Sequence, residues 1–269
     1  MRVPGARLYG WIDQGDAVDL VVEDARAARA ALEGWNGCDV IVQQAAGREK
    51  KLLAADMDST IIGQECIDEL ADYAGIKQSI AAITERAMNG ELDFAHALTE
   101  RVALLEGLDT AIIARCLHER IRPNPGAATL VRTMRARGAG TLLVSGGFLD
   151  FVEPVAAAVG FEHHAANRLG KEGNELNGLL VGAMVDAEAK KTAMMIECED
   201  RGIDASAVLA LGDGANDIPL VQAAGLGVAY RGKPALVAAS DARLDHHRLD
   251  ALLWAQGLAR KDWVRVQTL

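Results

Sequence analysis

Two aspartates, Asp56 and Asp58, flank Met57 directly after a short apolar run. The stretch from Lys51 to Thr60 is typical of a buried parallel strand that ends in two carboxylates. In open α/β sheets, ligands bind in the crevice outside the carboxyl ends of the strands. Because buried acids are costly without a cation or a proton donor beside them, this strand end predicts a metal site and proton-transfer chemistry.

An Asp-x-Asp pair is a weak signal by itself, because it also occurs in solvated turns and in nucleotide-sugar transferases that hold a divalent metal. The following Ser59 and Thr60, together with the strand, favour phosphoryl chemistry. A carboxylate can attack phosphorus and form an aspartyl-phosphate, while a second acid protonates the leaving oxygen and later activates water. Asp56 and Asp58 would supply both groups from one strand end.

Further acids follow a later strand. The motif Gly-Asp-Gly-Ala-Asn-Asp at residues 212–217 comes directly after the apolar run 207–211. Carboxylates repel a phosphate dianion unless a hard, oxygen-liganded cation neutralises the charge, so we expect Mg²⁺. Asp213 would bind this ion beside Asp56, and Asp217 would support the site without direct contact. A plain Gly-Asp-Gly turn is the alternative interpretation.

Phosphate oxygens also need hydrogen-bond donors, and another strand end offers them. The apolar run 140–144 ends in Ser145 and Gly146, so the Ser145 hydroxyl and the Gly146 amide would bind phosphate. A lysine at the start of a predicted helix over 187–201 would offset charge during transfer. Composition alone does not choose between Lys190 and Lys191.

The chain alternates strands and helices around these strand ends, apart from a long helical stretch from Ile61 to about Arg122. This stretch is too long for an ordinary crossover, and it predicts a cap over the site. Residues 123–126 then return the chain to strand–helix alternation, and residues 161–185 are typical of a hairpin. The expected fold is α/β, a three-layer Rossmann-like and mainly parallel sheet with a helical cap inserted after the first catalytic strand.

The N-terminal residues have a separate pattern. Residues 18–22 and 39–43 are predicted strands on either side of an Ala-rich helix, which together make a short βαβ-like unit. This unit would be a reduced regulatory domain or an extension of the sheet. We therefore expect three divisions of the chain: a small N-terminal βα region at 1–49, a catalytic core at 50–62 and 123–269, and the helical cap at 63–122.

Composition excludes several classes of function. With a net charge of −10 and a pI near 5.1, the 269-residue chain lacks the basic character of nucleic-acid-binding proteins. Its four cysteines are scattered, without the spacing of a zinc site, and indicate reduced thiols. The N-terminus lacks the apolar run of a signal peptide, and no stretch approaches the roughly 20 apolar residues of a transmembrane helix. We expect a cytoplasmic protein that binds neither nucleic acid nor membrane.

In their order, the motifs around Asp56, Ser145 and Asp213 resemble those of the haloacid dehalogenase superfamily of phosphohydrolases, and within it the phosphoserine phosphatases. The resemblance covers roughly residue 52 to the C-terminus, and the combined motifs are highly specific. It implies that Asp56 is the nucleophile and Asp58 the general acid/base. It also implies that Mg²⁺ is held by Asp56, the main-chain carbonyl of Asp58 and Asp213. The family's spacing before Gly-Asp-Gly selects Lys190.

The resemblance extends into the predicted cap. It implies that Glu65 binds the substrate ammonium and that Arg101 binds its carboxylate. Met88 and Phe94 would close over the bound molecule, and Asn216 of the core would also contact it. Phosphoserine does require an anionic partner, a bidentate cation and a lid that excludes water. From the residues alone, the favoured interpretation is that Glu65 is a helix-surface acid and Phe94 a core residue.

The expected activity is Mg²⁺-dependent hydrolysis of O-phosphoserine to serine and phosphate through an aspartyl-phosphate, the last step of serine biosynthesis. One alternative is a related enzyme that acts on another small phosphomonoester or passes the phosphoryl group to an alcohol such as homoserine. A remote alternative is a non-enzymatic module regulated by aspartate phosphorylation, although such a module would lack Asp58 as acid/base and the long cap. The sequence leaves open whether the chain is a monomer or a homodimer.

Overall fold

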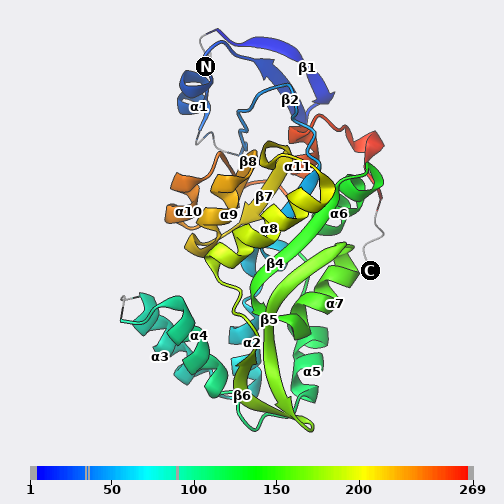
Figure 1. Ribbon diagram of the computed structural model, residues 1–269. Helices are drawn as coiled ribbons and strands as arrows, with labels where there is room; N and C mark the ends of the chain where they lie inside the picture. Colours follow the sequence, from blue (N-terminus) through cyan, green and yellow to red (C-terminus); the bar gives the residue numbers. More distant parts are fainter. Residues whose placement is uncertain (1–4, 34, 36, 89–90, 266–269) are drawn as a thin grey trace.

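The structure, a computed structural model, describes residues 5–33, 35, 37–88 and 91–265. Its main sheet has seven strands (Figure 1): β3 (Leu52–Ala55), β4 (Gly140–Phe148), β5 (His163–Glu172), β6 (Glu175–Val181), β7 (Val208–Gly212), β8 (Leu226–Tyr230) and β9 (Ala242–Leu244). Their order is β6-β5-β4-β3-β7-β8-β9, and every neighbouring pair is parallel except β5 and β6. The predicted mainly parallel sheet is therefore confirmed.

Strand β3 lies at the centre of this sheet, because its residues are all apolar and pack on both faces. Residues 52–55 are each 0% exposed. Strands β4 and β7 flank β3 in register, so that Ala55 lies opposite Leu143 on one side and Leu211 on the other. Because parallel strands end at the same edge of a sheet, the residues that follow β3, β4 and β7 come together there.

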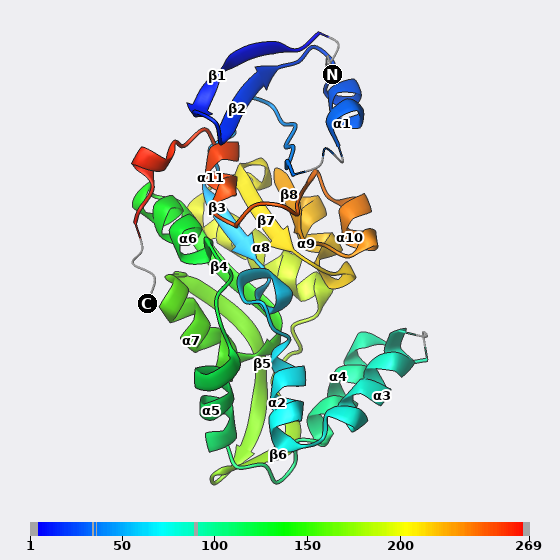
Figure 2. The ribbon, with the colours of Figure 1, turned by 180° about the vertical axis from the view of Figure 1, so that it is seen from behind.

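Helices cover both faces of the sheet and complete three layers (Figures 1 and 2). Apolar side chains of α6 (Ala127–Ala136), α7 (Leu149–Val159) and α11 (Ala251–Ala255) belong to one buried cluster. Those of α8 (Ala187–Arg201), α9 (Ile218–Ala223) and α10 (Pro234–Ala239) belong to a second cluster. Alternate residues of β3 join the two clusters, as expected for a sheet between two helical layers. The predicted three-layer α/β fold is confirmed.

Between β3 and α6 lie the helices α2 (Cys66–Ala74), α3 (Lys77–Met88), α4 (Phe94–Ala103) and α5 (Ala111–Arg120). They lie together at one end of the molecule, beside β5 and β6 (Figure 1). The Gly107 N–H donates to the Leu176 carbonyl at 2.8 Å, and the Leu176 N–H donates to the Leu108 carbonyl at 2.9 Å. The predicted hairpin is present as the antiparallel pair β5 and β6, and β6 supports the helical segment through these hydrogen bonds. The domain boundaries of the helical segment stay a prediction. Among the described helices, none has the length and apolar character that a membrane crossing requires.

The N-terminal region lies at the opposite end of the molecule from α2–α5 (Figures 1 and 2). It begins with an antiparallel pair, β1 (Arg7–Asp13) and β2 (Ala17–Val21), followed by α1 (Ala25–Leu32). The Asp13 carboxylate accepts hydrogen bonds from the Trp254 indole at 2.5 Å and from the Arg260 backbone at 2.8 Å. These contacts fix the β1–β2 hairpin to the C-terminal part of the core.

The predicted strand at residues 39–43 is wrong, and with it the βαβ-like unit, because this segment has no strand assignment. It contacts the core through side chains instead of a backbone ladder. The Asp39 carboxylate accepts hydrogen bonds from the backbone N–H groups of residues 245–247 and lies 2.8 Å from the His247 ring. Gln43 Nε2 donates to the Ala255 carbonyl at 2.6 Å. An extended apolar segment can therefore serve as a docked linker.

Replacing Asp39 by alanine is expected to lower the free energy of unfolding by about 2 kcal/mol at neutral pH, since hydrogen bonds to a charged group contribute about 1.5–3 kcal/mol. Burial opposes ionisation of Asp39, but hydrogen bonds from the Asp245 backbone and from His247 outweigh it and hold the pKa of the carboxyl below its ordinary value. The stabilisation is therefore complete above the ordinary aspartate pKa and is lost as the pH falls through the lowered pKa.

Urea unfolding of both proteins from neutral pH to about pH 2 measures this difference. The Asp200→Ala variant is the control, because Asp200 is exposed. A loss of stability in Asp39→Ala that is equally large at both ends of the pH range would contradict the expected role of the ionised carboxylate.

Candidate active site

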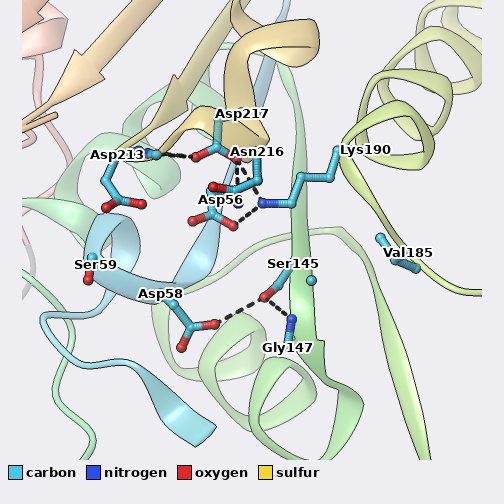
Figure 3. Close-up of polar contacts among 12 residues, drawn as sticks. Asp56, Asp58, Ser59, Ser145, Gly147, Val185, Lys190, Asp213, Asn216 and Asp217 are labelled. Atoms are coloured by element: carbon cyan, nitrogen blue, oxygen red, sulfur yellow. Dashed lines mark hydrogen bonds and ion pairs between the residues drawn. The ribbon is translucent and has the colours of Figure 1, made fainter. Parts of the chain in front are cut away.

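The chain turns sharply where β3 ends, and this turn carries Asp56 and Asp58. Asp56 is 3% exposed, and its N–H donates to the Leu211 carbonyl of β7 at 3.0 Å. Ser59 then has a φ of 54°, in the left-handed region that non-glycine residues rarely adopt. Strained backbone of this kind clusters at functional sites. Here it accompanies two aspartates whose side chains point in different directions (Figure 3).

Three buried carboxylates gather at this edge of the sheet. Asp56, Asp213 and Asp217 each offer an oxygen, and these oxygens lie within 4.8 Å of one another. Lys190 Nζ donates to Asp56 Oδ1 at 2.5 Å and to Asp217 Oδ1 at 2.7 Å (Figure 3), and the lysine is 1% exposed. One buried lysine thus serves two of the three acids. We call Asp56, Asp213 and Asp217 the acid cluster.

Asp217 orients the loop that follows β7. Its Oδ2 atom accepts hydrogen bonds from the backbone N–H groups of Asp213 at 3.1 Å and Gly214 at 3.2 Å. Its Oδ1 atom accepts from Lys190, and Asn216 Nδ2 lies 3.5 Å from the same oxygen. Because both oxygens are engaged, Asp217 is placed to position Asp213 and Lys190.

The charge balance of the acid cluster suits a divalent cation. Burial, followed by the charge of Asp217, raises the pKa of Asp56 well above its ordinary value, although Lys190 opposes this. Burial also raises the pKa of Asp213, against the opposing charge of Lys233. The nearby lysines therefore do not supply enough positive charge to balance the carboxylates when these are ionised. The available ligands are carboxylate oxygens, which hard cations prefer. Asp56 and Asp213 fit a metal ion, with Asp217 behind them.

Asp58 lies in a separate group with Ser145 (Figure 3). Its Oδ1 atom accepts from the Cys66 backbone at 2.9 Å, and its Oδ2 atom accepts from the Ser145 hydroxyl at 3.2 Å. Ser145 Oγ in turn accepts from the Gly147 N–H at 2.8 Å. A Cβ at Gly147 would lie only 2.9 Å from Asp58 Oδ2, so glycine permits this close approach. Burial raises the pKa of Asp58, which helps its carboxyl to carry a proton.

Glu65 and Arg101 are the charged residues of the helical segment that were predicted to bind the substrate. Glu65 accepts a hydrogen bond from the Ser59 hydroxyl at 2.7 Å, and burial, followed by the charge of Asp58, raises the pKa of Glu65 to about 7. Arg101 is half-buried, and its Nε donates to the Ala97 carbonyl at 3.2 Å. Burial lowers the pKa of Arg101, while the charge of Glu65 is among those that oppose this change. The predicted cap residues thus lie within electrostatic reach of each other.

Phe94 reaches across to the end of β4. Its Cζ atom lies 3.2 Å from the position that a Cβ would take at Gly146, and the residue is 38% exposed. An aromatic ring at the start of α4 therefore lies next to a residue that was predicted to bind phosphate. Met88 ends α3, but its side chain lies outside the described residues.

The comparison with protein families decides the wider class. Residues 53–222 match the model of the haloacid dehalogenase-like hydrolases, and this range contains the acid cluster, Asp58 and Lys190. The chain belongs to the haloacid dehalogenase-like hydrolases. The family resemblance inferred from the motifs is therefore confirmed.

This hydrolase is also similar to curated phosphatases. It is 43% identical over 212 residues to the phosphoserine phosphatase of Albidiferax ferrireducens. This alignment covers 76% of this chain and 88% of the relative. It is 42% identical over 215 residues to phosphoserine phosphatase SerB2 of Mycobacterium tuberculosis. This alignment covers 80% of this chain but only 52% of that longer relative. The chain thus spans about half the length of the mycobacterial protein.

A solved structure gives the same family likeness. A substrate-bound phosphoserine phosphatase complex matches with a TM-score of 0.70 and 33% sequence identity, over 76% of this chain and 97% of the other. The identity and coverage extend the likeness from the motifs to the arrangement of the whole catalytic region.

The hydrolase site contains two polar residues that the sequence analysis missed. Lys233 Nζ lies 3.1 Å from Asp213 Oδ2, and Asn167 Nδ2 donates to the Gly146 carbonyl at 2.8 Å. A signal for Lys233 existed, because it follows the apolar run 227–230, another strand that ends at this edge. Asn167 lies inside the long strand β5, where no local pattern separates it from other polar strand residues.

Replacing Lys190 by alanine is expected to destabilise the hydrolase by about 3 kcal/mol, because removing one partner of a buried ion pair leaves an uncompensated charge. The neighbouring Lys191 provides a matched control, since its side chain is 43% exposed and its Nζ lies 3.6 Å from Glu188 Oε2. Its alanine variant is expected to change stability by about 0.5 kcal/mol or less. Denaturant unfolding at neutral pH measures both variants, and equal losses would contradict the assignment of Lys190 to the acid cluster.

Proposed function

We propose that this hydrolase is a Mg²⁺-dependent phosphoserine phosphatase that converts O-phosphoserine to serine and phosphate. The observation that carries the proposal is the separation of two acids from one strand end. Asp56 lies against Lys190 in the acid cluster, whereas Asp58 lies against Ser145. One carboxylate is therefore suited to attack and the other to carry a proton. The similarity to phosphoserine phosphatases, one of them substrate-bound, supports the substrate.

The reaction begins at the Asp56 carboxylate. One oxygen attacks phosphorus in line with the seryl oxygen, so that the bond from phosphorus to the seryl oxygen breaks and an aspartyl-phosphate forms. Asp58 protonates the departing seryl oxygen and then accepts a proton from the water that hydrolyses the intermediate. The raised pKa of Asp58 suits both transfers.

Asp56, Asp213 and the main-chain carbonyl of Asp58 would hold Mg²⁺, with Asp217 positioning Asp213 through its backbone N–H. When bound, the ion would neutralise the repulsion between the carboxylates and the phosphate dianion. The donor set supports this choice, because it consists of oxygen atoms in a buried and electron-rich site.

The remaining core residues would bind the phosphoryl group. The Ser145 hydroxyl and the Gly146 amide supply donors, and Lys190 offsets charge next to Asp56. Asn216 lies on the same loop as Asp217 and would contact the substrate from that side. Preorganised donors of this kind stabilise charge as it develops in the transition state.

The helical segment would choose the substrate. Glu65 would bind the ammonium group and Arg101 the carboxylate, while Phe94 and Met88 would close over the bound molecule. The support for this assignment is the position of Glu65 beside Ser59 and of Phe94 beside Gly146. Exclusion of water by such a lid strengthens the charged contacts beneath it.

We infer further that the chain divides into an N-terminal region at 1–49, a catalytic core at 50–62 and 123–269, and a cap at 63–122. The continuous sheet and the helical segment beside β6 support this division. The proposed setting is the cytoplasm, where the enzyme would perform the last step of serine biosynthesis.

A phosphate-release assay over phosphorylated metabolites, with and without Mg²⁺, tests the proposal. We expect O-phosphoserine to give the highest kcat/KM and removal of the metal to abolish turnover.

Asp56→Asn preserves the side-chain shape but removes the attacking anion, so it is expected to lower kcat by at least about 1,000-fold with an unchanged circular dichroism spectrum. A preference for a sugar phosphate would contradict O-phosphoserine as the substrate. Full activity of Asp56→Asn would contradict the aspartyl-phosphate intermediate. Transfer of the phosphoryl group to added homoserine would identify the enzyme as a phosphotransferase.

Binding of O-phosphoserine is expected to weaken as the pH falls through about 7, because Glu65 must be ionised to bind the ammonium and its pKa is raised to about 7. Below that pH the carboxyl is neutral and the charge pairing is lost. Glu65→Gln is expected to raise KM about tenfold at alkaline pH and to remove this component of the pH dependence.

The pH profiles of KM for the two proteins measure the effect of Glu65. The substrate phosphate titrates near pH 6 in both experiments, so the difference between the profiles isolates Glu65. Parallel profiles for wild type and Glu65→Gln would contradict the role assigned to this carboxylate.

A further inference from the structure

Lys233 lies on the solvent side of the acid cluster. Its backbone N–H donates to the Asp213 carbonyl at 2.7 Å, and Pro234 follows it at the start of α10. The base of the side chain is therefore fixed to the loop that carries Asp213. The ammonium lies 3.1 Å from Asp213 Oδ2, and the lysine side chain is 67% exposed while that of Asp213 is 10% exposed. A solvent-accessible cation is thus tethered to a buried carboxylate.

The two lysines of the site differ in what their departure would cost. Lys190 is buried between Asp56 and Asp217, so moving it would leave two buried acids without their partner. Lys233 can turn into solvent with its charge fully hydrated, because its flexible stem already reaches the surface. Its charge also lowers the pKa of Glu65. Lys233 is therefore the exchangeable countercharge.

We propose that Lys233 competes with the divalent cation for Asp213. This inference rests on the metal site of the proposed function. The ammonium contacts one oxygen of the carboxylate that would bind the ion, and two cations at contact distance repel each other. Metal binding therefore requires the ammonium to leave Asp213, and this requirement lowers the affinity for the ion. Lys233 acts as a positioning residue that sets how tightly the metal is held.

Isothermal titration calorimetry of the full chain with magnesium chloride tests this competition without depending on turnover. Lys233→Met retains an unbranched stem and removes the charge, so it is expected to tighten Mg²⁺ binding about fivefold, as an ion pair with one exposed partner allows. Lys233→Arg retains the charge and is expected to stay within about twofold of wild type. Lys191→Met is the matched control, because Lys191 pairs with Glu188 and not with the acid cluster.

Unchanged or weaker Mg²⁺ binding in Lys233→Met would overturn the inference, and so would a tightening that Lys191→Met shares equally. The second result would report only the lower net charge of the chain. If wild type binds Mg²⁺ and Lys233→Met binds it equally well, the inference fails while the proposed function stands. If neither protein binds Mg²⁺, the metal site of the proposed function fails as well. Circular dichroism of each variant verifies that the fold is retained.

Discussion

Burial of three carboxylates at one sheet edge is the constraint on which the rest of this structure depends. Ionised Asp56, Asp213 and Asp217 repel one another where water cannot screen them, so positive charge must be brought to them. Lys190 reaches them from α8 and is itself buried, an arrangement that is tolerable only because it has two acidic partners. The α/β core therefore holds its buried acids through interactions between segments that are distant in the chain.

The same strand end separates two acids that lie two residues apart. In a continuing strand, Asp56 and Asp58 would lie on the same face and would share one environment. The chain leaves the strand instead, and the positive φ of Ser59 accompanies the change in direction. Asp56 consequently lies in the acid cluster, while Asp58 lies beside Ser145. This separation supports the proposed roles of Asp56 as nucleophile and Asp58 as proton carrier.

The errors and omissions of the sequence analysis share a physical cause. Residues 39–43 have a strand-like pattern, but a strand needs a backbone partner, and Asp39 instead anchors the segment through its carboxylate. Likewise, Lys190 and Lys191 are identical in type and adjacent in sequence, yet the helix directs one into the acid cluster and leaves the other beside Glu188. The relevant partners are distant along the chain, and local pattern does not report them.

The sequence by itself determined that acids follow the first strand and a later one, and that a long helical segment intervenes. These features depend on apolar runs and on the rule that parallel strands end at one edge, both of which are local or topological. Only the tertiary structure decided that Lys190 joins Asp56 to Asp217, that Glu65 accepts a hydrogen bond from Ser59, and that Lys233 lies on Asp213. Burial and charge pairing depend on residues that are distant along the chain and that only the folded structure brings together.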